Sequence, residues 1–164
     1  MFSEALLERA SEVLSVCRER SFHIATAESC TGGLIVGCLT EVAGSSDVVD
    51  RGFVTYTNEA KTDLLGVPCV LFVDHGAVSE PVARAMVEGA LARSAAQIAV
   101  AVTGIAGPGG GTDTKPVGLV HMAVGRIDGV IVHQSQIFQG DRTAVRLQTV
   151  ETVLGMILDL VGED

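Results

Sequence analysis

The segment AQIAVAVTG, residues 96–104, is the feature that most constrains the fold of this chain. It is a continuous apolar run of strand length, which is typical of a strand buried on both faces. Aromatic residues make up only 4% of the chain, so Val, Ile, Leu and Ala must build the core. Such a composition suits a sheet that helices cover on both sides.

The other elements follow from apolar spacing and turn residues. We expect helices over residues 3–20, 58–66, 79–95 and 141–161, a turn running into a helix over 29–42, and strands over 21–28, 47–57, 96–104, 117–127 and 130–138. Residues 67–79 read as irregular, and Ser79 is expected to cap the next helix. Asp141 is expected to cap the last helix.

Asp128-Gly129 between the last two strands predicts a hairpin, which makes the sheet mixed rather than wholly parallel. We therefore expect the α/β class, as a three-layer α/β/α sandwich with a mixed sheet of about five strands. A single domain is expected to cover residues 1–164.

Charge and composition narrow the function. The formal net charge of −9 disfavours nucleic acid as a partner, and an anionic small molecule would need local cations to hold it. The only lysines are Lys61 and Lys115. The N-terminus carries charges throughout and no apolar run reaches the roughly 18 residues of a membrane span, so we expect a cytoplasmic protein. The four cysteines lack C-x-x-C spacing, so we expect free thiols.

The stretch from Glu28 to Gly33, ESCTGG, lies where a buried strand turns into a helix. A hydroxyl there, at Ser29, would lie beside backbone N–H groups able to stabilise an oxyanion. Simple helix capping by Ser29 or Thr31 explains the same residues and, because capping is so common, is the more frequent role for them. Cys30 is a rival nucleophile, because a thiol at a helix N-terminus has a lowered pKa. The residues alone leave Ser29 and Cys30 undecided.

A serine nucleophile needs a base. His75 is the only histidine placed in a predicted loop, so support for a Ser-His pair is thin. Lys61, in the segment TNEAK after a predicted strand, is the alternative, provided that burial keeps it neutral. Without burial, Lys61 would be a solvated helix residue paired with Glu59 or Asp63.

Two further segments could bind an anion. The Gly-rich loop from Thr103 to Pro116 begins at the carboxyl end of a buried strand and could form an anion-binding nest near Lys115, or be merely flexible. It is not a P-loop. Arg142 and Arg146 are spaced to share one helix face, and could grip a phosphate or form surface ion pairs.

Together, AESCTGG, GFVTYTNEAK with LLGV, HGAVS, TGIAGPGGGTDTKPVG and GDR resemble, in this order, the CinA C-terminal family, from about residue 3 to residue 160. The resemblance implies an amidase that converts nicotinamide mononucleotide to nicotinate mononucleotide and ammonia, using a serine and a lysine and no metal or other cofactor. The family's serine falls on Ser29 and its lysine on Lys61. Longer members carry an N-terminal pterin-binding-like domain, which we expect to be absent here.

We expect the following residues to bind the substrate: Cys30, Thr31, Gly32, Gly33, Tyr56, Asn58, Thr103, Gly104, Gly107, Gly110 and Arg142. N–H groups at Thr31 to Gly33 would stabilise the oxyanion, and Arg142, the Gly-rich loop and Lys115 would hold the phosphate. The partner is thus a small anionic nucleotide, with neither nucleic acid nor membrane, and a homodimer is the default expectation for a small enzyme. A regulatory module without turnover, or an amidase for another small amide, fits the same residues.

Overall fold

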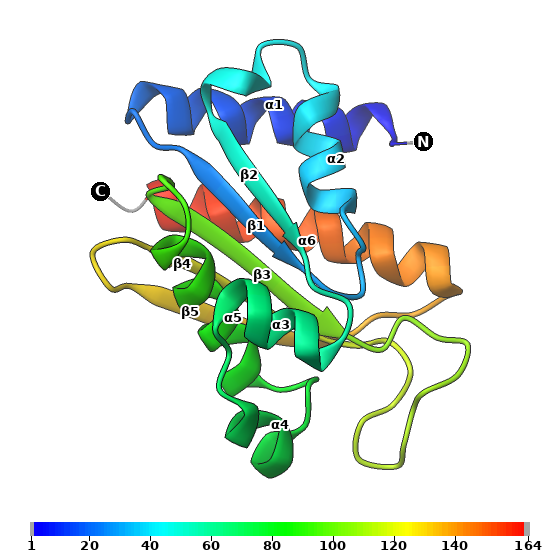
Figure 1. Ribbon diagram of the computed structural model, residues 1–164. Coiled ribbons are helices and arrows are strands. Elements are labelled where there is room, and N and C mark those ends of the chain that lie inside the picture. Colours follow the sequence, from blue (N-terminus) through cyan, green and yellow to red (C-terminus); the bar gives the residue numbers. More distant parts are fainter. Residues whose placement is uncertain (1, 163–164) are drawn as a thin grey trace.

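A five-stranded mixed sheet forms the centre of the protein (Figure 1). The computed structural model describes residues 2–162. The strands are β1 (Ile24–Glu28), β2 (Val49–Val54), β3 (Ile98–Gly104), β4 (Leu119–Arg126) and β5 (Ile131–Ile137), in the spatial order β2-β1-β3-β4-β5. Strand β1 runs parallel to β2 and β3, whereas β4 runs antiparallel to β3 and β5. The predicted mixed sheet and its hairpin are confirmed.

Helices cover both faces of this sheet. They are α1 (Glu4–Glu19), α2 (Leu34–Glu41), α3 (Asn58–Leu65), α4 (Cys69–His75), α5 (Glu80–Ala92) and α6 (Arg142–Gly162), with a short 3-10 helix at Ser45–Asp47. Side chains of α1, α2 and α6 form one apolar cluster with the sheet, and those of α3 and α5 form a second on the opposite face. The predicted three-layer α/β/α arrangement is therefore confirmed. Within residues 2–162, no helix is long and apolar enough to span a membrane.

Strand β3 shows why the central apolar run lacks alternation. Val100 and Val102 belong to the cluster with α1, α2 and α6, whereas Ala99 and Ala101 belong to the cluster with α3 and α5. All four are fully buried, as the sequence predicted. The alanine side of the sheet leaves room for helices to pack closely.

Residues 69–75 form α4, so the prediction of an irregular stretch over residues 67–79 is wrong for this part. No residue of α4 is buried, so its sequence carries no apolar periodicity that would reveal a helix. Ser79 does occupy the N-cap position of α5, but its hydroxyl donates to Gly76 O rather than accepting from the helix. Asp141 does cap α6, accepting a hydrogen bond from Ala144 N at 2.8 Å.

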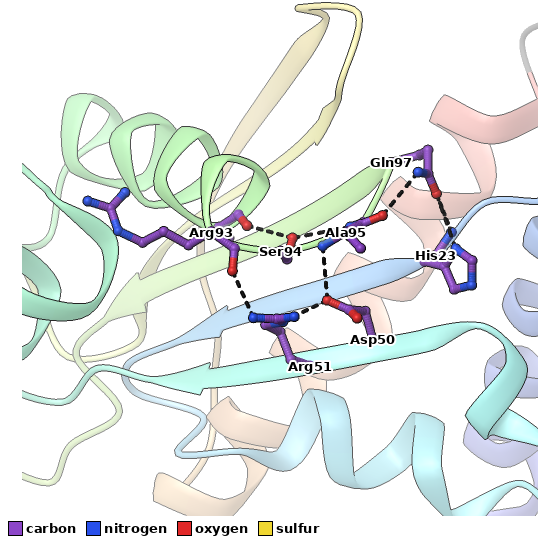
Figure 2. A network of polar contacts seen from close by, with 9 residues as sticks. His23, Asp50, Arg51, Arg93, Ser94, Ala95 and Gln97 are labelled. Carbon is purple, nitrogen blue, oxygen red and sulfur yellow. Dashed lines mark hydrogen bonds and ion pairs between the residues drawn. The ribbon is translucent and has the colours of Figure 1, made fainter.

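A polar network fastens the amino ends of the central strands (Figure 2). The Asp50 carboxylate at the start of β2 accepts hydrogen bonds from Arg51 Nε at 2.7 Å and from Ala95 N at 3.2 Å. Arg51 Nη1 also donates to Arg93 O at 2.9 Å. These contacts join β2 to the connection between α5 and β3. The candidate site lies at the other end of these strands, where β1, β2 and β3 have their carboxyl ends.

Candidate active site

A cavity of about 290 Å³ opens at the carboxyl ends of β1 and β3, where open α/β sheets bind ligands. The end of β2, the start of α3, the α4–α5 loop, the Gly-rich loop and the first residue of α6 complete its wall. Its lining residues are Ser29, Cys30, Tyr56, Asn58, Lys61, Ala77, Val78, Thr103, Gly104, Ile105, Ala106, Gly107, Gly109, Gly110 and Arg142.

Ser29 and Lys61 meet at the base of this cavity, although they are 32 residues apart in sequence. Lys61 Nζ lies 3.0 Å from Ser29 Oγ and donates to Thr55 O at 2.8 Å. Helix α3 begins at the Thr57 cap, whose hydroxyl accepts from Ala60 N. Lys61 and Leu65, four residues apart, are the two buried residues of α3, so Lys61 points inward with the apolar face.

Lys61 is only 1% exposed, so the interpretation of it as a solvated surface lysine is wrong. Burial lowers the pKa of its ammonium group, because an apolar setting disfavours the charged form. Within residues 2–162, no carboxylate lies within ion-pair distance of Nζ to offset this effect. A neutral amine at this position can accept the Ser29 hydroxyl proton.

Cys30 lines the same cavity, but its thiol is not activated as a nucleophile. Burial raises the pKa of its thiol to about 11, so the expected lowering at a helix N-terminus is wrong. The thiol therefore remains protonated near neutral pH, and protonated thiols are poor nucleophiles. The 3.0 Å approach of Lys61 Nζ to Ser29 Oγ, beside a protonated Cys30 thiol, favours Ser29 over Cys30, a choice that the sequence left open.

Glu28 is a buried carboxylate that the sequence analysis did not single out as functional. It is fully buried at the end of β1, directly before Ser29. Its oxygens accept hydrogen bonds from Thr26 Oγ1, Thr31 Oγ1, Gly33 N, Ile35 N and Val36 N. Glu28 thus satisfies the first N–H groups of α2, a task the capping interpretation gave to Ser29 or Thr31. A lone acidic residue ending an apolar strand was the signal available.

Thr31, Gly32 and Gly33 do not line the cavity. The N–H of Gly32 donates to Ser29 O at 3.0 Å, and that of Gly33 donates to Glu28 Oε2 at 3.1 Å. These two N–H groups are therefore already engaged and cannot meet an oxyanion. The structure therefore does not place Thr31, Gly32 and Gly33 on the cavity wall, and their part in substrate binding stays a prediction.

The remaining predicted residues do line the cavity: Tyr56, Asn58, Thr103, Gly104, Gly107, Gly110 and Arg142. Arg142 joins the Gly-rich loop to the segment after β2: it donates from Nη1 to Gly107 O and from Nη2 to Tyr56 Oη, both at 2.8 Å. Thr103 Oγ1 donates to Ala77 O at 2.8 Å, which brings in the α4–α5 loop; this loop belongs to the segment HGAVS, for which no substrate-binding residue was predicted. Lys61 and Arg142 are the basic residues of the lining, and Arg142 is the one available to bind an anion.

Lys115, His75 and Arg146 lie outside the lining. Lys115 Nζ donates to His75 O and so fastens the Gly-rich loop to the end of α4. The structure thus gives no support to Lys115 as a phosphate ligand or to His75 as a base. Arg146 donates to backbone carbonyls of the turn after Ser29. No group of three or more potential metal ligands is found among residues 2–162.

Comparisons with known proteins agree with this architecture. Residues 7–161 match the CinA C-terminal domain family. A CinA-like protein from Mycobacterium sp. (strain JLS) is 54% identical over 134 residues, which are 82% of this chain and 32% of that protein. The crystal structure of competence/damage inducible protein CihA from Agrobacterium tumefaciens has a TM-score of 0.96 at 51% identity, covering 99% of both chains. A CinA superfamily protein from Escherichia coli has a TM-score of 0.91 at 32% identity, covering 98% of this chain and 94% of that one. The chain spans about a third of the length of the curated relatives it matches.

Proposed function

Because this chain belongs to the CinA C-terminal domain family, we propose that it is an amidohydrolase with Ser29 as nucleophile and Lys61 as base. The observation that carries the proposal is the 3.0 Å separation of Ser29 Oγ from a buried lysine amine whose pKa is lowered. A buried amine without a carboxylate partner costs stability, and such groups cluster at functional sites.

The proposed substrate is nicotinamide mononucleotide, and the products are nicotinate mononucleotide and ammonia. Arg142 supports an anionic substrate, since two of its five N–H donors bond the cavity walls and the others can meet a phosphate. Gly107 and Gly110, both with left-handed backbone (φ 84° and 86°), let a ligand approach the loop closely.

The reaction divides into two steps. Ser29 Oγ attacks the carboxamide carbon while Lys61 Nζ takes the hydroxyl proton; the C–N bond then breaks and ammonia leaves with that proton. Water attacks the resulting ester, Lys61 accepts a proton from the water, and this proton returns to Ser29 Oγ as the acid departs. Because Gly32 and Gly33 N–H groups are engaged, the oxyanion needs other donors around the cavity.

Ammonia release from nicotinamide mononucleotide tests the proposal. We expect wild-type protein to release ammonia, and Ser29→Ala and Lys61→Ala to lose at least about 1000-fold in kcat. Cys30→Ala should keep activity within roughly tenfold, since its thiol stays protonated. Cys69→Ala, at the exposed cysteine on α4, is the matched thiol control.

Other outcomes separate the alternatives. Nucleotide binding in calorimetry without ammonia release would identify a binding module that lacks turnover. Equal turnover of nicotinamide riboside, which lacks the phosphate, would argue for another small amide as substrate. Full activity of Ser29→Ala with an inactive Cys30→Ala would reverse the choice of nucleophile.

A further inference from the structure

Arg146 holds the backbone of the turn that carries Ser29. Its Nε donates to Cys30 O at 3.1 Å and its Nη2 donates to Thr31 O at 2.8 Å. The guanidinium thus binds the carbonyls of the two residues directly after the nucleophile. Arg146 lies outside the cavity lining, so its contacts are with this turn and not with the space that a substrate would fill.

Glu28 holds the same turn and the start of α2 through backbone N–H groups. Its carboxylate accepts the N–H groups of Gly33, Ile35 and Val36 at 2.9–3.1 Å. A buried anion therefore binds N–H groups at the end of the turn and the start of α2, and a cation binds carbonyl groups of the same turn. Charge-assisted hydrogen bonds of both kinds are shorter and stronger than neutral ones, so they restrict where Ser29 can lie.

Arg142 lies one helical turn before Arg146 on α6. Its guanidinium bonds Gly107 O and Tyr56 Oη in the cavity wall. The first two turns of α6 therefore contact both the proposed anion-binding wall and the nucleophile turn. A helix is stiff over this length, so it can fix the distance between these two parts of the site.

We propose that Arg146 is a positioning residue, which sets Ser29 Oγ relative to Lys61 Nζ and relative to a substrate held at Arg142. The proposal rests on the proposed function for its substrate, but the nucleophilicity of Ser29 can be measured without that substrate. Arg146 does not touch the reacting atoms, so its loss should slow bond formation and leave ground-state binding nearly unchanged.

The experiment follows the covalent labelling of Ser29 by a small alkyl fluorophosphonate, with ammonia release from nicotinamide mononucleotide measured in parallel. We expect Arg146→Lys to lower the labelling rate roughly 10- to 100-fold, because a lysine keeps the charge but cannot bind two carbonyls as a fork. In hydrolysis, kcat should fall by a similar factor while KM changes less than about threefold. The control is Arg18→Lys, at an exposed arginine that also bonds a backbone carbonyl, Gly44 O, and should label at the wild-type rate.

Chemical rescue separates positioning from loss of fold. Millimolar guanidinium should restore part of the labelling rate of Arg146→Ala, whereas the labelling rate of a merely destabilised protein should not respond, because guanidinium is far too dilute at this concentration to change stability. Wild-type labelling by Arg146→Lys, a raised KM at unchanged kcat, or no rescue would each overturn the inference. Labelling of wild-type Ser29 without ammonia release would reject the proposed substrate and leave the positioning role standing, and no labelling of wild type would reject both.

Discussion

Lys61 combines two properties that oppose each other. Its burial makes it usable as a base, but the same burial removes a charged group from water at a cost in stability. Its contacts with Ser29 Oγ and Thr55 O offset only part of this cost. Sites of this kind trade stability for activity.

We expect Lys61→Met to abolish activity and to stabilise the protein by about 1–2 kcal/mol at pH 7, a rise in Tm of about 3–6 °C. The pKa of Lys61 in the folded protein lies below its unfolded value of about 10.4. Between these two pKa values the unfolded chain binds one more proton than the folded protein, so the free energy of unfolding of the wild type rises with pH. The advantage of the variant should therefore shrink as pH approaches 10. Calorimetric Tm values between pH 6 and 10 test this, with Lys115→Met as the control; parallel pH curves for wild type and Lys61→Met would refute it.

At the site, sequence reasoning found the residues that have unusual chemistry but not those that hold them. Ser29, Lys61 and Arg142 stood out as a hydroxyl, a rare lysine and an arginine near a helix start. Glu28 and Arg146 act through backbone N–H and carbonyl groups, whose positions depend on how β1, α2 and α6 pack. The Arg146 contacts join segments more than 100 residues apart, so no residue spacing encodes them. The Glu28 contacts span only five to eight residues, but they depend on how the turn after β1 folds back onto the carboxylate.

At the scale of elements, the strands were predictable because burial leaves a periodic or continuous apolar pattern. Helix α4 was not, since none of its residues is buried and its seven residues, CVLFVDH, are rich in β-branched and aromatic side chains. The polar network at Asp50 was also missed, because it depends on β2 lying beside the connection between α5 and β3. Its place at the amino ends of the strands predicts a stabilising contribution separate from catalysis.

Asp50→Asn should therefore lower Tm by about 2–3 °C at pH 7 and leave ammonia release unchanged. The hydrogen bond from Arg51 lowers the pKa of the Asp50 carboxyl, so its contribution is present above about pH 4 and is lost as pH falls through the folded pKa. Wild type and variant should converge in Tm on acidification toward pH 3. Asp74→Asn, at an exposed residue of α4, provides the control, and an equal effect of both substitutions would contradict the assignment.

At the scale of the whole molecule, β5 leaves one edge of the sheet open. Val130 O accepts from Arg126 N at the end of β4, and Phe138 N donates to Gly118 O directly before β4. Because bonded and outward residues alternate along an antiparallel strand, the backbone N–H and C=O groups of residues 133, 135 and 137 point away from β4. The strand IVHQSQI contains no Asp, Glu, Lys, Arg or Pro, the residues that commonly block edge pairing. In a chain of net charge −9, a strand without Asp or Glu offers a second copy little like-charge repulsion of its own. The charged side chains beside it are Arg84, which donates to Ile131 O, and Glu80, which contacts His133.

We therefore expect a homodimer in which two β5 strands pair antiparallel about a two-fold axis near Ser135, extending the sheet through both copies. Light scattering should give twice the chain mass, and the dimer should tighten with added salt, since salt screens the repulsion between two acidic chains. Ser135→Pro removes an outward N–H without breaking a bond to β4, so it should give a folded monomer, whereas Ser135→Thr should remain dimeric. Even an interface with a micromolar Kd would make the protein mainly dimeric at about 100 μM. A wild-type protein that is monomeric at this concentration would therefore rule out this edge as the interface.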